Sequence, residues 1–121
     1  MKKTLLIIED NEDILSGLVD GMGNFFKVNI SQATTVAAGL GLIQNSEINA
    51  IICDYNLPDG TGLAILDLIQ KRKSTIPFFL YSGSVSLDLT KVTYQNFSFV
   101  RKPNFGELVS LISKSSIFDL N

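Results

Sequence analysis

Short apolar runs alternate along this chain with stretches in which apolar residues recur at helical spacing. A short apolar run is typical of a buried strand, whereas apolar positions three and four residues apart are typical of a helix that buries one face. Strands that alternate with helices predict a parallel sheet with right-handed crossovers. The expected strands are residues 5–8, 26–30, 50–54, 78–82 and 97–101.

The expected helices follow these strands. Asn11 or Asp13 can cap the first, and the glycines at positions 21 and 23 end it. Further helices are expected after Thr35, over residues 63–69 and from Phe105 onward. Residues 86–96 have a partial apolar stripe with threonines, which are poor helix formers, so we expect a short or mobile helix there. The pattern predicts an α/β fold with a doubly wound, five-stranded parallel sheet and five helices.

The composition is that of an ordinary globular domain. The chain has 121 residues, of which 45% are hydrophobic and 18% charged, so one core is expected. A net charge of -2 with scattered lysines and arginines argues against direct nucleic-acid binding. No apolar run approaches the ~20 residues of a membrane span. We therefore expect one cytoplasmic domain over residues 1–121, with a core of roughly 4–114 and a short tail at 115–121, and no membrane insertion.

Cys53 is the only cysteine, so the chain has no internal disulfide. It lies inside an apolar run and is expected to be a small buried hydrophobe instead of a reactive thiol.

Polar side chains stand at the carboxyl ends of four expected strands. In an open parallel sheet, ligands bind at this edge. Each residue alone has an ordinary explanation, since a carboxylate can cap a helix, a lysine can be a surface charge and a serine before glycine can form a turn. Together they predict a site, and its members are Glu9, Asp10, Asp54, Ser82 and Lys102.

The charges of this set indicate what it binds. Three carboxylates and one ammonium leave an excess of two negative charges. Two like charges ~4 Å apart repel by about 4 kcal/mol at an effective dielectric constant of about 20, so a divalent cation is needed. Oxygen ligands favour Mg²⁺ over zinc, and Mg²⁺ on a few carboxylates is the arrangement used with phosphates. The set therefore suits a metal-assisted phosphoryl acceptor.

Four segments, in order and at family-like spacing, resemble the receiver domain of two-component response regulators, the family of the bacterial chemotaxis regulator. The similarity covers roughly residues 4–114. It implies a flavodoxin-like sheet with strand order 2-1-3-4-5, and a signalling domain that turns over no external substrate. The segments are Ile8-Glu9-Asp10-Asn11, Asp54-Tyr55-Asn56-Leu57-Pro58-Asp59-Gly60, Phe78-Phe79-Leu80-Tyr81 leading into Ser82-Gly83, and Val100-Arg101-Lys102-Pro103.

The resemblance implies a role for each residue of the site. Asp54 would be the nucleophile that accepts phosphate from a sensor histidine kinase or a histidine phosphotransfer protein. Asp10 would bind Mg²⁺ directly and Glu9 largely through water, while the backbone carbonyl of Asn56 would be a further ligand beside Asp54. Lys102 would pair with Asp54 and then with the phosphoryl oxygens.

The resemblance also implies a switch and a docking surface. Ser82 would hydrogen-bond the new phosphoryl group by moving its loop inward, and Phe99 would follow into the vacated space. The kinase or phosphotransfer protein would dock near Ile14, Pro103 and Asn104. The downstream protein is not identified by the sequence.

Three other classes stay open at this point. A haloacid-dehalogenase-like phosphatase also uses a strand-end aspartate, but it needs a second acid two residues later, where this chain has Asn56. A flavodoxin-like cofactor binder needs a phosphate loop after the first strand, where Glu9 and Asp10 would repel phosphate. A degenerate receiver would act only as a protein-binding module and would not require the charged set.

Overall fold

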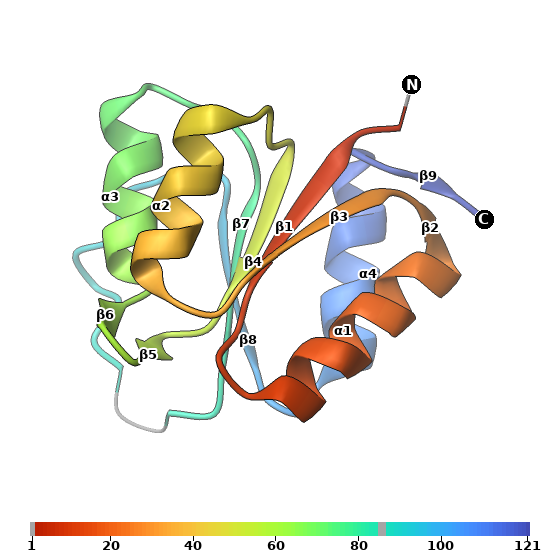
Figure 1. Ribbon diagram of the computed structural model, residues 1–121, viewed down its shortest axis with the longest axis horizontal. Coiled ribbons are helices and arrows are strands. Elements are labelled where there is room, and N and C mark those ends of the chain that lie inside the picture. The colour runs from red at the N-terminus through yellow and green to blue at the C-terminus, as the bar shows by residue number, and fades with distance from the viewer. Residues whose placement is uncertain (1, 85–86) are drawn as a thin grey trace.

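The computed structural model describes residues 2–84 and 87–121. A five-stranded parallel sheet lies between two layers of helices (Figure 1). The order β3-β1-β4-β7-β8 corresponds to 2-1-3-4-5 for the sheet strands along the chain, and it confirms the predicted doubly wound fold. These strands are β1 (Thr4–Ile8), β3 (Asn29–Ala33), β4 (Ala50–Cys53), β7 (Phe78–Ser82) and β8 (Phe97–Arg101).

Two helices cover each face of the sheet. Helices α1 (Glu12–Phe25) and α4 (Phe105–Ser115) cover one face, and α2 (Val36–Asn45) and α3 (Leu63–Lys71) cover the other (Figure 1). Successive side chains of β1 therefore enter different cores, because strand side chains alternate between faces. Among the described residues, no helix has the length and apolar character needed to cross a membrane.

The second predicted strand, residues 26–30, is wrong in its bounds. Phe26 is instead the C-cap that follows α1, where its N–H donates to the carbonyl of Met22, and it begins β2 (Phe26–Lys27). Strand β2 pairs with β9 (Asp119–Leu120), which lies beyond α4. The sheet strand is β3, an edge strand that is half exposed and therefore lacks a continuous apolar run.

The helix predicted over residues 86–96 is wrong for residues 87–96, which form a loop with turns. Residue 86 lies outside the described residues, which contain four helices instead of the predicted five. The side chain of Asp88 accepts hydrogen bonds from the backbone N–H of Thr90 at 3.0 Å and from its hydroxyl at 2.6 Å. Such local bonds compete with the backbone bonds of a helix.

This loop packs on the core in place of a helix. Leu87 and Leu89 are half-buried against the α3 side of the sheet. The hydroxyl of Tyr94 donates to the backbone carbonyls of Ser74 at 3.1 Å and Ile76 at 2.7 Å. The side chains of this loop therefore cover the part of the sheet where a helix was expected.

Cys53 ends β4 and is fully buried, which confirms the prediction from its apolar neighbours. Burial raises the pKa of its thiol far above the ordinary value, so the thiol stays protonated and unreactive.

Candidate metal and phosphoryl-transfer site

The carboxyl ends of β1 and β4 bring three acidic residues together. The backbone N–H of Glu9 donates to the carbonyl of Ala33 at 3.0 Å, and that of Asp54 donates to the carbonyl of Ile8 at 2.9 Å. These bonds extend the strand pairing to the acidic residues. One carboxylate oxygen each of Glu9, Asp10 and Asp54 lies within 4.8 Å of the others.

The three carboxylates differ in exposure. Glu9 is 2% exposed, Asp54 is 9% exposed and Asp10 is exposed to solvent. Burial raises the pKa of Glu9, and the hydrogen bonds from Lys102 and from the backbone of Asn11 offset only part of this effect. The buried glutamate is therefore held by protein donors, while the two aspartates offer the more accessible oxygens.

Lys102 joins two of these carboxylates. Its Nζ lies 3.2 Å from Oδ2 of Asp54, the pairing that the resemblance implied, and 2.6 Å from Oε1 of Glu9, a pairing that was not predicted. Burial would lower the pKa of Lys102, but the hydrogen bond to Glu9 and the charge of Asp54 outweigh it and raise this pKa. The stabilisation from its charge is therefore complete below the ordinary pKa of 10.5 and is lost as pH rises through the raised value.

The donor chemistry of this cluster fits a hard divalent cation. The groups that face one another are carboxylate oxygens from Glu9, Asp10 and Asp54, and Lys102 balances only one of the negative charges. Mg²⁺ prefers such oxygen ligands and keeps several waters. The accessible position of Asp10 leaves room for those waters.

Ser82 lies at the end of β7, next to Lys102 in the sheet. Its backbone carbonyl accepts a hydrogen bond from the N–H of Lys102 at 3.0 Å, and its buried hydroxyl accepts one from the N–H of Ser84 at 3.3 Å. The side-chain amide of Asn56 donates to the hydroxyl of Ser84 at 2.7 Å. The loops after β4 and β7 are thereby joined beside the acidic cluster.

Tyr81 is a contact that sequence reasoning missed. Nζ of Lys102 lies 5.9 Å from the centroid of its ring, within cation–π range. Tyr81 points to the α1 side of the sheet because it alternates with Ser82 along β7. It lines a hollow of about 280 Å³ together with Ile14, Gly17, Leu18, Pro103 and Phe105.

The structure places the remaining predicted residues as follows. Ile14 and Pro103 line this hollow together, whereas Asn104 is the exposed N-cap of α4 and is not among the lining residues. Phe99 is half-buried on the opposite face of the sheet, where the guanidinium carbon of Arg101 lies 6.0 Å from its ring centroid.

Gly62 allows the loop after Asp54 to return close to β4. A Cβ here would lie 2.4 Å from the carbonyl oxygen of Asp54 and 2.9 Å from Sγ of Cys53. Because a backbone atom cannot yield as a flexible side chain can, we expect Gly62→Ala to lower the free energy of unfolding by about 1–3 kcal/mol in urea titrations. Gly41→Ala is the control, since nothing lies within 4 Å and this position is inside α2. It should stabilise by about 1 kcal/mol, and a similar gain from Gly62→Ala would refute the steric argument.

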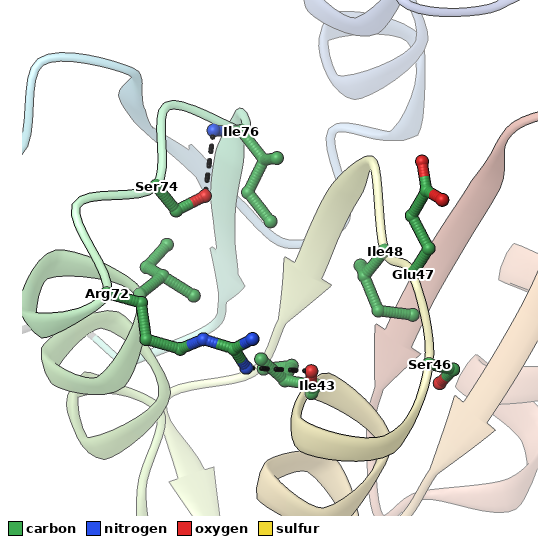
Figure 2. Close-up of a pocket in the computed structure, with 8 residues that line it drawn as sticks. Ile43, Ser46, Glu47, Ile48, Arg72, Ser74 and Ile76 are labelled. Atoms are coloured by element: carbon green, nitrogen blue, oxygen red, sulfur yellow. Dashed lines mark hydrogen bonds between the residues drawn. The ribbon is translucent and has the colours of Figure 1, made fainter.

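Another hollow, of about 250 Å³, lies at the other end of the strands from the acidic cluster, beside the segments that precede β4 and β7 (Figure 2). Arg72 reaches across it and donates from Nη1 to the carbonyl of Ile43 at 2.9 Å. This carbonyl is near the end of α2, which has no basic residue in its last turn, and a cation is favourable there. Arg72 therefore stabilises the fold at a distance from the acidic cluster. The hollow is lined by Ile43, Ser46, Glu47, Ile48, Ile69, Arg72, Ser74 and Ile76.

Comparison with known protein families matches residues 5–113 to the response regulator receiver domain. The chain belongs to this family. The assignment favours the receiver over the phosphatase and the cofactor binder that the sequence left open.

Related proteins agree with this assignment. The receiver domain is 28% identical over 115 residues to the response regulator protein PilR of Pseudomonas aeruginosa, covering 93% of this chain and 26% of PilR. It is 27% identical over 82 residues to the photosynthetic apparatus regulatory protein RegA of Rhodobacter capsulatus, covering 67% of this chain and 44% of RegA. The chain thus spans less than half the length of either relative.

Solved structures share the fold of the receiver domain. The signal receiver domain of an HD domain-containing protein from Pseudomonas fluorescens Pf-5 superposes with a TM-score of 0.83 at 19% identity, covering 94% of each chain. A CheY-like receiver domain protein from Methanospirillum hungatei JF-1 gives 0.81 at 23% identity, covering 95% of this chain and 94% of the other.

Proposed function

We propose that this receiver domain accepts a phosphoryl group on Asp54 in a reaction that depends on Mg²⁺. The observation that carries the proposal is the meeting of Glu9, Asp10, Asp54 and Lys102 at one edge of the sheet. In the reaction, a carboxylate oxygen of Asp54 forms a bond to the phosphorus of a phosphohistidine. The phosphorus–nitrogen bond breaks, the imidazole leaves with its electron pair, and Asp54 becomes an acyl phosphate.

The residues of the site have distinct tasks. Mg²⁺, bound by Asp10, Asp54 and the carbonyl of Asn56, and through water by Glu9, would neutralise charge on the phosphoryl oxygens. Lys102 presents its ammonium to the same oxygens. Its hydrogen bond to Glu9 holds that charge in place before the reaction, so little rearrangement is needed.

We propose that a sensor histidine kinase or a histidine phosphotransfer protein supplies the phosphoryl group. Support comes from the family and from the hollow next to the site, which Ile14 and Pro103 line. The hydroxyl of Ser82 would then turn from Ser84 toward the phosphoryl oxygens, and Phe99 would change its packing. A downstream protein would recognise this changed conformation.

Labelling with acetyl phosphate tests the proposed function without a kinase. We expect the wild-type protein to incorporate phosphate when Mg²⁺ is present and none when EDTA removes it. Equal incorporation under both conditions would exclude a role for the metal. Absence of incorporation under both would favour a degenerate receiver that only binds proteins.

If the hollow lined by Ile14 and Pro103 is the docking site, a variant there should impair transfer from a kinase but not labelling by acetyl phosphate. Ile14→Arg places a charge in the apolar hollow and should slow transfer from any histidine kinase that phosphorylates the wild type by about tenfold or more, a loss of about 1.4 kcal/mol. Labelling by acetyl phosphate should not change. Gln44→Arg, at an exposed position on α2 of the opposite layer, is the control. If the two variants slow transfer to the same extent, the hollow is not the docking site.

A further inference from the structure

The hairpin that follows Asp54 is tied to the first turn of α2 by one carboxylate. The hairpin consists of β5 (Asn56–Leu57) and β6 (Gly60–Thr61) and lies beside the start of α2 (Figure 1). At its tip, Oδ1 of Asp59 accepts the N–H of Val36 at 2.7 Å, and Oδ2 accepts the N–H of Ala37 at 3.0 Å. Each oxygen has its own donor, so the contact fixes both position and orientation.

Two side chains share the capping of this helix end. The first N–H groups of a helix have no partner within the helix and need one from elsewhere. Thr35 is the local cap, and its hydroxyl accepts the N–H of Ala38 at 3.0 Å. Asp59 caps the two preceding N–H groups from a distant part of the chain. The two caps therefore serve the same helix, but only Asp59 also holds the hairpin.

The hairpin itself contains two residue pairs, Asn56 with Thr61 and Leu57 with Gly60. It is also held by Leu57, which is buried in the core on the α2 side of the sheet, and by the hydrogen bond from the side chain of Asn56 to Ser84. The tip packs directly on α2, because a Cβ on Gly60 would lie 3.5 Å from Cγ2 of Val36. The backbone φ of Gly60 is 154°, a value that side-chain-bearing residues rarely adopt. The clamp from Asp59 is thus the contact that ties the tip of this hairpin to α2.

The charge of Asp59 supports this interpretation. Its hydrogen bonds from Ala37 and Val36 lower its pKa below the ordinary value of 3.8, so the carboxylate is ionised at neutral pH. A negative charge is favourable at a helix N-terminus.

We propose that Asp59 is a positioning residue for the cation site, which clamps the hairpin to α2 and thereby holds the backbone carbonyl of Asn56 in place as a ligand. This inference rests on the proposed function, because it requires that carbonyl to bind Mg²⁺. Residues that orient metal ligands typically change metal affinity by about 10–100-fold when they are replaced.

The test compares Asp59→Ala with Thr35→Ala, which removes a cap of the same helix and leaves the hairpin clamp intact. Mg²⁺ dissociation constants are measured by titration calorimetry, and stability by urea unfolding. We expect Asp59→Ala to weaken Mg²⁺ binding about tenfold, whereas Thr35→Ala destabilises the fold and leaves Mg²⁺ affinity unchanged. Asp59→Asn keeps one acceptor oxygen and should recover part of the affinity.

The outcomes separate this role from the function on which it rests. If the wild type binds Mg²⁺ and Asp59→Ala binds it equally well, the positioning role is wrong and the proposed function stands. Equal weakening by Thr35→Ala would also overturn the role, because helix capping alone would then explain the effect. A wild type that binds no Mg²⁺ would overturn the proposed function together with this inference.

Discussion

Asp54→Asn is expected to incorporate no phosphate from acetyl phosphate and Mg²⁺, under conditions in which the wild type is labelled. The amide has almost the same size and can still accept the hydrogen bond that Oδ1 receives from the N–H of Tyr55 at 2.8 Å. It lacks the anionic oxygen that attacks phosphorus, so the expected loss is complete. Intact-protein mass spectrometry measures the uptake directly.

Asp67→Asn is the matched control for this variant. Asp67 is an exposed aspartate on α3, and its replacement changes the net charge of the protein by the same amount. The control should be labelled like the wild type. Undiminished labelling of Asp54→Asn would show that another group is the acceptor.

Lys102→Met is expected to lower the rate of labelling by about 100-fold or more, because a fixed positive group next to the phosphoryl oxygens is lost. It should also destabilise the protein in EDTA, since Glu9 would remain 2% exposed without its ammonium partner. Removal of one partner of a buried pair typically costs about 3–5 kcal/mol. Urea unfolding measures this loss.

The loss of stability in Lys102→Met should depend on pH. Burial raises the pKa of Glu9 above the ordinary 4.5, and loss of the ammonium should raise it further. A carboxyl whose pKa is raised by folding binds its proton more tightly in the folded state, so stability falls as pH rises through that range. The deficit of Lys102→Met should therefore be larger at neutral pH than in acid. Lys91→Met, at an exposed loop position, should stay within about 0.5 kcal/mol of the wild type at either pH. If Lys102→Met loses the same amount of stability at neutral and at acid pH, this explanation is wrong.

The central strands β1, β4 and β7 were predictable because they are buried on both faces: β7 has the predicted bounds, residues 78–82, and β1 and β4 differ from prediction by one residue at one end. Strand β8 also has its predicted bounds, residues 97–101, although it is an edge strand, because it carries apolar residues such as Phe97, Phe99 and Val100. Edge strand β3 was not predictable from apolar character, since its exposed positions carry polar residues. The loop over residues 87–96, where a helix was expected, was not fully predictable either. The bonds of Asp88 to Thr90 are local, but those from the hydroxyl of Tyr94 to Ser74 and Ile76 depend on tertiary packing.

The acidic cluster followed from the rule that parallel strands end at one edge of the sheet. Sequence order alone could not show that Lys102 lies closer to Glu9 than to Asp54, since the choice depends on side-chain packing. The capping of α2 by Asp59 joins residues 23 positions apart and leaves no periodic signal. Pro58 and Gly60 are typical turn residues and indicate only that the chain turns here.

Reductive trapping would identify the phosphorylated residue. Borohydride reduces the acyl phosphate of an aspartate to homoserine and so marks the residue that carried the phosphoryl group. After treatment with acetyl phosphate and Mg²⁺, we expect homoserine at position 54, and aspartate there when EDTA replaces Mg²⁺. Homoserine at another position, or at position 54 without Mg²⁺, would contradict Mg²⁺-dependent phosphorylation of Asp54.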